Sequence, residues 1–239
     1  MRILAIETAT SVGSVALLDG HEVVREIVEQ VPQRHLEWLA PAIARALESS
    51  GWGPDDVAGV AVSLGPGLFT GLRIGVATAA AWAYARRVPI VGVSTLEVIA
   101  AGTVAAGAEG LICPVLDARR GEVAFALFEG KPRAVRVVGE TIGPVSALVD
   151  RMPEGAAITF SGDGIPRIHD AIRTRPRTVI APEATWSPRA AFVGAIALGR
   201  LAHGDHDDPS LLRPVYARGA GISPSPWIVI PEAGEGTPR

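Results

Sequence analysis

The sequence is poor in two residue types that often carry chemistry. Its 239 residues include one cysteine, Cys113, and one lysine, Lys131. A single cysteine excludes an internal disulfide, and its position in the apolar run 111–116 predicts a buried packing residue rather than a nucleophile. Without another lysine, the chain has neither a phosphate-binding loop with its lysine nor a lysine placed to form a Schiff base.

Long apolar runs and surplus positive charge are also missing. No run of apolar residues is long enough to span a bilayer. The first residues have the pattern of a strand rather than of a secretion signal. We therefore expect a cytoplasmic protein that does not bind membranes. The formal net charge of −3 predicts that the chain does not bind nucleic acid alone, because neutralising phosphates requires a concentrated basic surface.

What the chain does contain is apolar sequence for a large core, since 48% of its residues are hydrophobic. Both halves begin with three strand patterns in a row and continue with helices between buried strands. This order predicts an α/β fold of two lobes, each with a mixed sheet that a β-meander opens. The predicted parts are an N-terminal lobe (1–103), a smaller C-terminal lobe (104–220) and a loosely ordered tail (221–239).

The loop Gly65-Pro66-Gly67 and the helix predicted after it, over 69–86, form the most informative segment. The two glycines permit backbone angles that a side chain forbids, and the proline fixes its own φ. The backbone of this loop can therefore lie close to a neighbouring segment. Small residues then recur along the helix at a spacing of four and form one smooth seam. The seam residues are Gly71, Gly75, Ala79 and Ala83.

This helix is apolar over most of its circumference, and a helix that is apolar all round is buried all round. We expect a second chain to cover the face that the lobe leaves open, extended by an exposed Trp38 on the preceding helix. Packing of the seam against the chain's own sheet or the helix over 32–50 is the alternative. The predicted interface residues are Trp38, Gly71, Leu72, Gly75, Val76, Ala79, Trp82 and Ala83.

Two lobes that each open with a meander resemble the actin-like ATPase (ASKHA) architecture of sugar kinases and Hsp70 chaperones, in which two hairpins bind nucleotide phosphates. A closer resemblance, to the TsaB/YeaZ family, extends from residue 1 to about residue 130 and resumes weakly at 214–218. The segment 65–75 is highly specific for that family. The segments that carry the resemblance are 3–10 (ILAIETAT), 65–75 (GPGLFTGLRIG), 92–97 (GVSTLE) and 117–123 (DARRGEV).

The resemblance implies a non-catalytic dimerisation or scaffold subunit of a bacterial tRNA-modifying complex. That complex forms threonylcarbamoyladenosine next to the anticodon, and its implied partners are a TsaD-like catalytic paralogue and a TsaE-like ATPase. The family also implies a homodimer when the chain is alone, and contact with tRNA only through the complex. Relatives have carried an older glycoprotease label.

The residues at the two expected phosphate hairpins are poorly suited to nucleotide. Glu7 stands where an active enzyme carries Asp, and arginines follow Asp117 where a phosphate-binding turn needs small residues. A third loop, 161–164, resembles the adenosine-side loop of the fold but is also an ordinary strand-to-helix turn. We predict at most weak ATP or ADP binding, at the interface of the complex. The candidate residues are Glu7, Thr8, Thr10, Asp117, Arg119, Gly162 and Gly164.

No catalytic residue and no metal site are predicted. The catalytic paralogue is expected to hold a metal with two histidines four residues apart on a helix, and none of the five histidines here has such a neighbour. His203 and His206 lie among aspartates, a pattern that favours a solvated helix end over a metal site. An active actin-like ATPase or kinase, or a metallopeptidase, remain the alternative functions.

Overall fold

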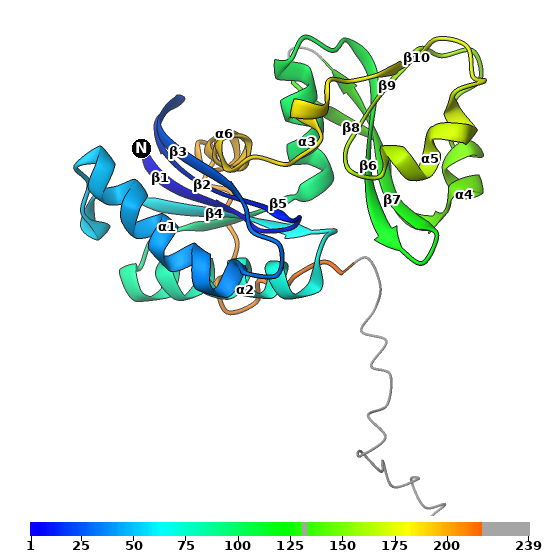
Figure 1. Cartoon of the computed structure of the whole chain (residues 1–239). Helices are drawn as coiled ribbons and strands as arrows, with labels where there is room; N and C mark the ends of the chain where they lie inside the picture. Colours follow the sequence, from blue (N-terminus) through cyan, green and yellow to red (C-terminus); the bar gives the residue numbers. More distant parts are fainter. Residues whose placement is uncertain (131–132, 217–239) are drawn as a thin grey trace, which may run out of the picture.

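The computed structural model describes residues 1–130 and 133–216, which form two lobes side by side (Figure 1). The predicted tail, 221–239, lies outside the described residues. Within the described ranges, no helix is both long and apolar enough to cross a membrane.

The first lobe contains a five-stranded mixed sheet in the order β3-β2-β1-β4-β5. The first three strands form the predicted antiparallel meander, whereas β4 and β5 run parallel to β1. Helices α1 (His35–Ser50) and α2 (Phe69–Arg86) cover one face of this sheet (Figure 1). The strands are β1 (Arg2–Glu7), β2 (Val12–Asp19), β3 (Glu22–Gln30), β4 (Gly59–Gly65) and β5 (Ile90–Ser94), and a short 3-10 turn, Pro54–Asp56, precedes β4.

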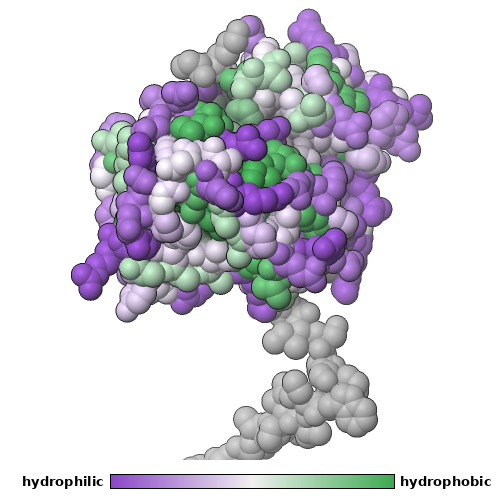
Figure 2. Space-filling model, turned by 60° about the vertical axis from the view of Figure 1, so that its left-hand side comes forward, coloured by the Kyte–Doolittle hydropathy of each residue, from purple (hydrophilic) through white to green (hydrophobic). Residues whose placement is uncertain are grey.

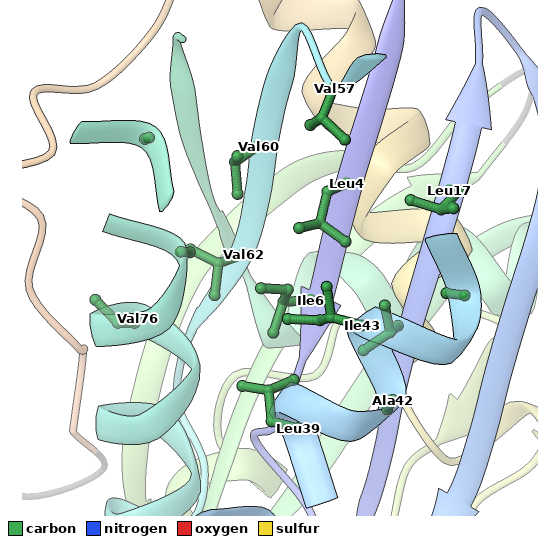
Figure 3. Packing of buried hydrophobic residues seen from close by; sticks show 14 of the residues in the cluster. Leu4, Ile6, Leu17, Leu39, Ala42, Ile43, Val57, Val60, Val62 and Val76 are labelled. Carbon is green, nitrogen blue, oxygen red and sulfur yellow. The ribbon is translucent and has the colours of Figure 1, made fainter. Parts of the chain in front are cut away.

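Alternation along β1 explains why helices pack on both faces of the sheet, because successive side chains of a strand point to opposite sides. Ile6 points toward α1 and α2, where it joins Ile43 and Val76 in one buried cluster (Figure 3). Ile3 points the other way and joins Val193 of the last helix, α6 (Ala190–Leu201). Both sides of β1 are therefore fully buried.

The second lobe repeats the arrangement with a sheet in the order β10-β9-β6-β7-β8. Helix α3 (Thr95–Ala105) covers one face, and α4 (Val145–Val149) and α5 (Ile165–Ile172) cover the other. The meander β6-β7-β8 lies where three strands are predicted. The strands are β6 (Gly110–Arg119), β7 (Glu122–Gly130), β8 (Val135–Pro144), β9 (Ile158–Ser161) and β10 (Thr178–Ile180), and a 3-10 turn, Glu183–Thr185, follows β10.

Helix α6 corrects the predicted lobe division, which assigns residues 104–220 to the second lobe. The helix packs on the first sheet, and the backbone N–H of its first residue, Ala190, donates to the Ser14 hydroxyl at 2.7 Å. The chain then stays with the first lobe, since Val215 N donates to Leu64 O at 2.6 Å. The physical reason is that α1 and α2 cover only one face of the first sheet, and the other face needs an apolar cover.

Local signals around the first two helices agree closely with the structure. The range of α2 is the predicted one, 69–86. Helix α1 begins at His35 and continues through Pro41, and Gly51 ends it in the left-handed region with φ of 71°. The last helix, α6, begins at Ala190, and no side chain of its own segment caps it.

Candidate functional site

The small-residue seam of α2 lies against Thr8, at the end of β1. A Cβ placed on Gly75 would come within 2.1 Å of Thr8 Oγ1, and one placed on Gly71 would come within 2.1 Å of the Thr8 carbonyl oxygen. The Thr8 hydroxyl donates a hydrogen bond of 2.9 Å to the Gly71 carbonyl. The seam therefore permits close approach, as predicted, but the approach is to the chain's own first strand.

This placement corrects most of the predicted interface. The seam and its neighbours are buried inside the first lobe, so they cannot meet a second chain while the lobe is folded. These buried residues are Gly71, Leu72, Gly75, Val76, Ala79 and Ala83.

The two predicted interface tryptophans are not exposed either. Trp38 is 8% exposed, its ring packs against Gly13, and its indole N–H donates to a Glu29 carboxylate oxygen at 3.0 Å. It belongs to the core because α1 packs its ring against β2 and its indole N–H against β3. Trp82 is partly buried, and its indole nitrogen has no hydrogen-bond partner among the described residues.

Glu7, the first predicted nucleotide ligand, is a fully buried carboxyl group. One carboxylate oxygen accepts from Ala9 N at 2.6 Å, and the other accepts from the Ser63 hydroxyl. Burial raises the pKa of Glu7 from its ordinary value of 4.5 to about 7, because loss of hydration outweighs the hydrogen bonds from Ser63 and the backbone of Ala9 and Thr8. The carboxyl group thus titrates near neutral pH inside the core.

The other polar groups around this first hairpin are also turned inward. Thr8 and Thr10 are buried, and Thr10 Oγ1 lies 3.2 Å from both the N–H and the carbonyl oxygen of Val12. His35, at the start of α1, is buried, and its Nε2 has no hydrogen-bond partner within the described part of the chain. Burial lowers the pKa of His35, which favours the neutral ring. A nucleotide phosphate needs hydrogen-bond donors that face open space. The polar side chains of this hairpin are buried, so they do not form a phosphate site.

The second hairpin, β6–β7, gathers a polar cluster at the surface of the second lobe. Arg167 of α5 donates from Nε and Nη2 to one oxygen of Asp117, at 3.3 Å each. The Asp117 backbone N–H donates to Asp163 at 3.0 Å, and the Arg119 N–H donates back to Asp117 at 2.8 Å. Burial, followed by the charge of Asp117, raises the pKa of Asp163, although the Asp117 N–H opposes that shift.

The structure therefore brings Asp117 and Arg119 together, and adds Asp163 and Arg167. Sequence reasoning missed these two residues as members of the cluster, although the turn 161–164 and the position of Arg167 in the first turn of α5 were available signals. Among the described residues, no hydrogen bond or ion pair joins this cluster to Glu7, Thr8 or Thr10.

Gly162 and Gly164 serve close packing in the second lobe. Gly162 has φ of 112°, and a Cβ there would lie 2.1 Å from the Val115 carbonyl oxygen. A Cβ on Gly164 would lie 2.7 Å from the Val115 side chain. Both glycines are thus needed for the close packing of this turn on β6, as expected for an ordinary strand-to-helix turn.

The histidines that sequence analysis weighed as metal ligands lie at the end of α6. His203 is exposed, with Nδ1 2.8 Å from the Gly199 carbonyl oxygen, and Asp205 forms an ion pair with Arg200 at 2.7 Å. Over residues 1–130 and 133–216, no three His, Cys, Asp or Glu side chains are grouped so that they could hold a metal ion.

Two lobes, each opened by a β-meander and flanked by helices, define this chain as a member of the actin-like (ASKHA) fold class. The activator of the 2-hydroxyisocaproyl-CoA dehydratase from Clostridium difficile has this arrangement. It superposes with a TM-score of 0.51 over 85% of this chain and 97% of that chain, at 10% identity.

The family is narrower than the fold. A family model described as TsaD, tRNA N6-adenosine threonylcarbamoyltransferase, matches residues 25–194. YeaZ from Pseudomonas aeruginosa superposes with a TM-score of 0.80 over 90% of this chain and 99% of that chain, at 25% identity. The tRNA threonylcarbamoyladenosine biosynthesis protein TsaB of Bacillus subtilis is 37% identical over 131 residues, 55% of this chain and 56% of that protein. The chain belongs to the TsaB/YeaZ family, and it spans about half the length of the curated TsaB relatives that it matches.

Proposed function

We propose that this chain is a non-catalytic subunit of the machinery that makes threonylcarbamoyladenosine in tRNA, and that it supports a TsaD-like catalytic paralogue. The observation that carries this proposal is the closed first hairpin. Its carboxyl and hydroxyl groups are bonded within the chain, and α2 lies directly on Thr8. A phosphate-binding hairpin requires the reverse, with free donors and small residues facing the cleft.

The surface proposed for the catalytic paralogue is the outward side of α2, opposite the buried seam. Its five exposed residues follow one another at helical spacings of three and four, and the third and fourth are alanines that let a partner helix come close. Tyr84, at one end, is 78% exposed, and Leu36 of the adjoining α1 is 75% exposed. The residues of this outward stripe are Thr70, Arg73, Ala77, Ala81 and Tyr84.

The other end of the outward stripe is held in place by aromatic contacts. The Arg73 guanidinium lies 3.8 Å from the centroid of the Phe69 ring, and its Nε donates to the Tyr216 hydroxyl at 2.8 Å. The Phe69 and Tyr216 rings are themselves 4.7 Å apart. A pre-formed surface loses less side-chain entropy on binding, which favours association.

The remaining partners follow from the same proposal. A TsaE-like ATPase and tRNA would meet this subunit within the complex, in the cytoplasm, and nucleotide would be bound by the partners. An active actin-like ATPase is the main alternative, and a metallopeptidase is the other.

The experiment compares Ala81→Arg on the outward stripe with Ala171→Arg on α5, also an exposed helical alanine but in the second lobe. Co-elution with the TsaD-like protein of the same organism should be lost for Ala81→Arg and retained for Ala171→Arg. The isolated wild-type chain should not turn over ATP. Sustained ATP turnover by the isolated chain would overturn the scaffold proposal, and normal pairing of Ala81→Arg would show that the surface is misplaced.

A further inference from the structure

The outer edge of β3 is a surface that no described strand covers, and it is separate from the outward stripe of α2. β3 is nine residues long and lies at the end of the first sheet. Three of its valines are open to solvent, with Val23 at 44%, Val24 at 38% and Val28 at 37% exposure. A long edge strand with exposed apolar side chains is a template for another strand, and proteins commonly cover such an edge.

The register of the meander shows which backbone groups of β3 are free to bond outward. Val31 N donates to Ser11 O at 2.8 Å, so these two residues form a hydrogen-bonded pair. Bonded and non-bonded positions alternate along antiparallel strands, and no bulge interrupts β3 after residue 25. Ile27 therefore directs its backbone groups toward β2, whereas Glu26 and Val28 direct theirs outward.

Two neighbouring grooves follow the junction between β3 and α1. One, of about 560 Å³, is lined by residues 25–29 and by Arg45 of α1. The other, of about 250 Å³, also borders Arg45 and continues past Gln30 to Arg34, just before α1. A strand added to β3 would direct every second side chain into these grooves. The left-hand side of Figure 1, where α1 and the curled end of β3 lie, comes forward in Figure 2, and apolar patches there are bordered by hydrophilic atoms.

The chain carries a segment suited to this edge beyond the described residues. Residues 227–230 (WIVI) are one tryptophan and three β-branched residues, which favour strands. Pro226 and Pro231 flank this segment. Proline ends the pairing of a strand wherever a backbone donor is required, so the sequence limits this strand to its four central residues.

The last described contacts place the start of this segment within reach of β3. Val215 N donates to Leu64 O at 2.6 Å near the end of β4, and the Tyr216 ring lies 4.7 Å from that of Phe69. β3 and β4 run in the same direction, so both end at the same side of the sheet. A strand outside β3 would lie four strand spacings from β4, or roughly 19 Å, whereas residues 217–226 span up to about 33 Å. A segment that arrives at this side meets the end of β3 and runs antiparallel to it.

We propose that residues 226–231 pair antiparallel with the outer edge of β3 of the same chain and form a sixth strand of the first sheet. Trp227 lies opposite Val28, and Val229 lies opposite Glu26. The outward backbone groups of β3 then gain partners in both pairs, and the indole ring covers the open valine.

The two prolines select this register. Pro226 lies opposite Glu29, at a position where an N–H of the added strand would point away from β3, so the missing donor costs no bond. A shift by one residue in either direction places Pro226 opposite Gln30 or Val28, whose outward carbonyl would then lack a donor. Pro231 comes to the bulge of β3 at residue 24, where the regular pairing ends in any case.

The side chains on the α1 face fit the same register. Ile228 lies opposite Ile27 and enters the larger groove, where Ile27 is packed on the core of the first lobe. Ile230 lies opposite Arg25, which forms no hydrogen bond or ion pair with any described residue. Glu232 follows two residues later and is close enough to pair with this arginine, a favourable contact between neighbouring strands.

Disulfide capture tests the register directly. In a Cys113→Ala background, Ile27→Cys with Ile228→Cys should form an intramolecular disulfide on mild oxidation, because facing residues at a non-bonded position have Cα atoms about 4.5 Å apart. Val179→Cys with Ile228→Cys is the matched control, since Val179 is an exposed valine of β10, the edge strand of the second sheet. The control should stay reduced. Non-reducing gels and peptide mass spectrometry identify the products.

Three results of this capture would each overturn the proposal. They are the absence of a 27–228 disulfide in a chain that circular dichroism shows to be folded, equal crosslinking in the control, and a crosslinked product of twice the mass. The last result would mean that the segment pairs with β3 of another copy. The test is independent of the proposed function, because Ala81→Arg should still form the 27–228 disulfide.

Amide exchange followed by NMR is the second test. The N–H groups of Glu26 and Val28 should exchange slowly in the wild type and about tenfold faster or more in Ile228→Lys, because that variant removes the apolar contact of the added strand. The N–H of Ile27, which bonds to β2, should not change. Ile222→Lys, in the same tail but outside the pairing segment, is the matched control and should keep the wild-type rates. Equal exchange of Val28 in the wild type and Ile228→Lys would overturn the proposal.

Discussion

At the residue scale, Thr8 sets how near α2 lies to the first sheet. Its hydroxyl fills the space that a side chain at position 75 would occupy, and the same hydroxyl bonds to the carbonyl of Gly71. Thr8, more than sixty residues earlier in the chain, therefore requires glycine at both Gly71 and Gly75, which lie one helical turn apart. The close contact fixes the first hairpin in its closed form.

Gly75→Ala should destabilise the folded chain rather than only weaken an interface. The new Cβ would overlap Thr8 Oγ1, and such overpacking costs about 1 to 3 kcal/mol of unfolding free energy. Gly199→Ala in α6 is the matched control, because a Cβ there meets nothing within 4 Å. The unfolding free energy of the control should rise by up to about 1 kcal/mol, since alanine favours helix. Urea unfolding measures the stability of both variants. A Gly75→Ala variant as stable as the wild type would contradict the packing described for α2.

Glu7 should make the stability of the chain depend on pH. Its folded pKa of about 7 lies above the ordinary value of 4.5, so the folded state binds the proton more tightly than the unfolded state does. The resulting stabilisation is fully present below pH 4.5 and is lost as pH rises through 7, a change of roughly 3 kcal/mol.

Glu7→Gln keeps the hydrogen-bonding shape without the titration. The variant should match the wild type below pH 4.5 and exceed it in stability at pH 8, by urea unfolding at each pH. Glu48→Gln on the exposed side of α1 serves as the control and should follow the wild type. Parallel pH profiles for Glu7→Gln and the wild type would show that Glu7 is not buried as described.

At the element scale, α6 depends on a strand far from it in sequence. No side chain of its own segment caps its first turn, and the buried Ser14 hydroxyl of β2 accepts from Ala190 N instead. Arg189 adds an ion pair with Glu26 of β3. The last helix is therefore attached to the opening meander, and the two ends of the described chain are joined in one lobe.

Ser14→Ala should lower the unfolding free energy by about 1 to 2 kcal/mol, because it leaves the buried Ala190 N–H without an acceptor. Ser49→Ala removes a hydroxyl that only bonds back to its own helix and should change stability little. Thermal unfolding of both variants is the measurement. Equal melting temperatures would mean that α6 does not rely on the meander.

At the scale of the whole molecule, local patterns predicted elements well but not which elements touch. The limits of α2 and the two meanders follow from periodicity and turn residues. The seam spacing also predicted a close approach at Gly75, yet helical spacing identifies a face and not its neighbour, so Thr8 could not be found that way. Trp38 was placed at an interface because α1 alone cannot show that Glu29 of β3 covers it. The second-lobe cluster was found only in part, because Asp163 and Arg167 meet Asp117 through tertiary folding.

The most direct test of the scaffold account is the yield of threonylcarbamoyladenosine when tRNA and the TsaD-like and TsaE-like proteins of the same organism are combined with this chain. Asp117→Asn with Arg119→Gln, which disables the second hairpin, should support the wild-type yield. Ala81→Arg should reduce the yield by about tenfold or more, since a charge at the centre of an interface removes most of its affinity. A yield lost with the hairpin variant and kept with Ala81→Arg would contradict the account, because the chain would then act through its own nucleotide site.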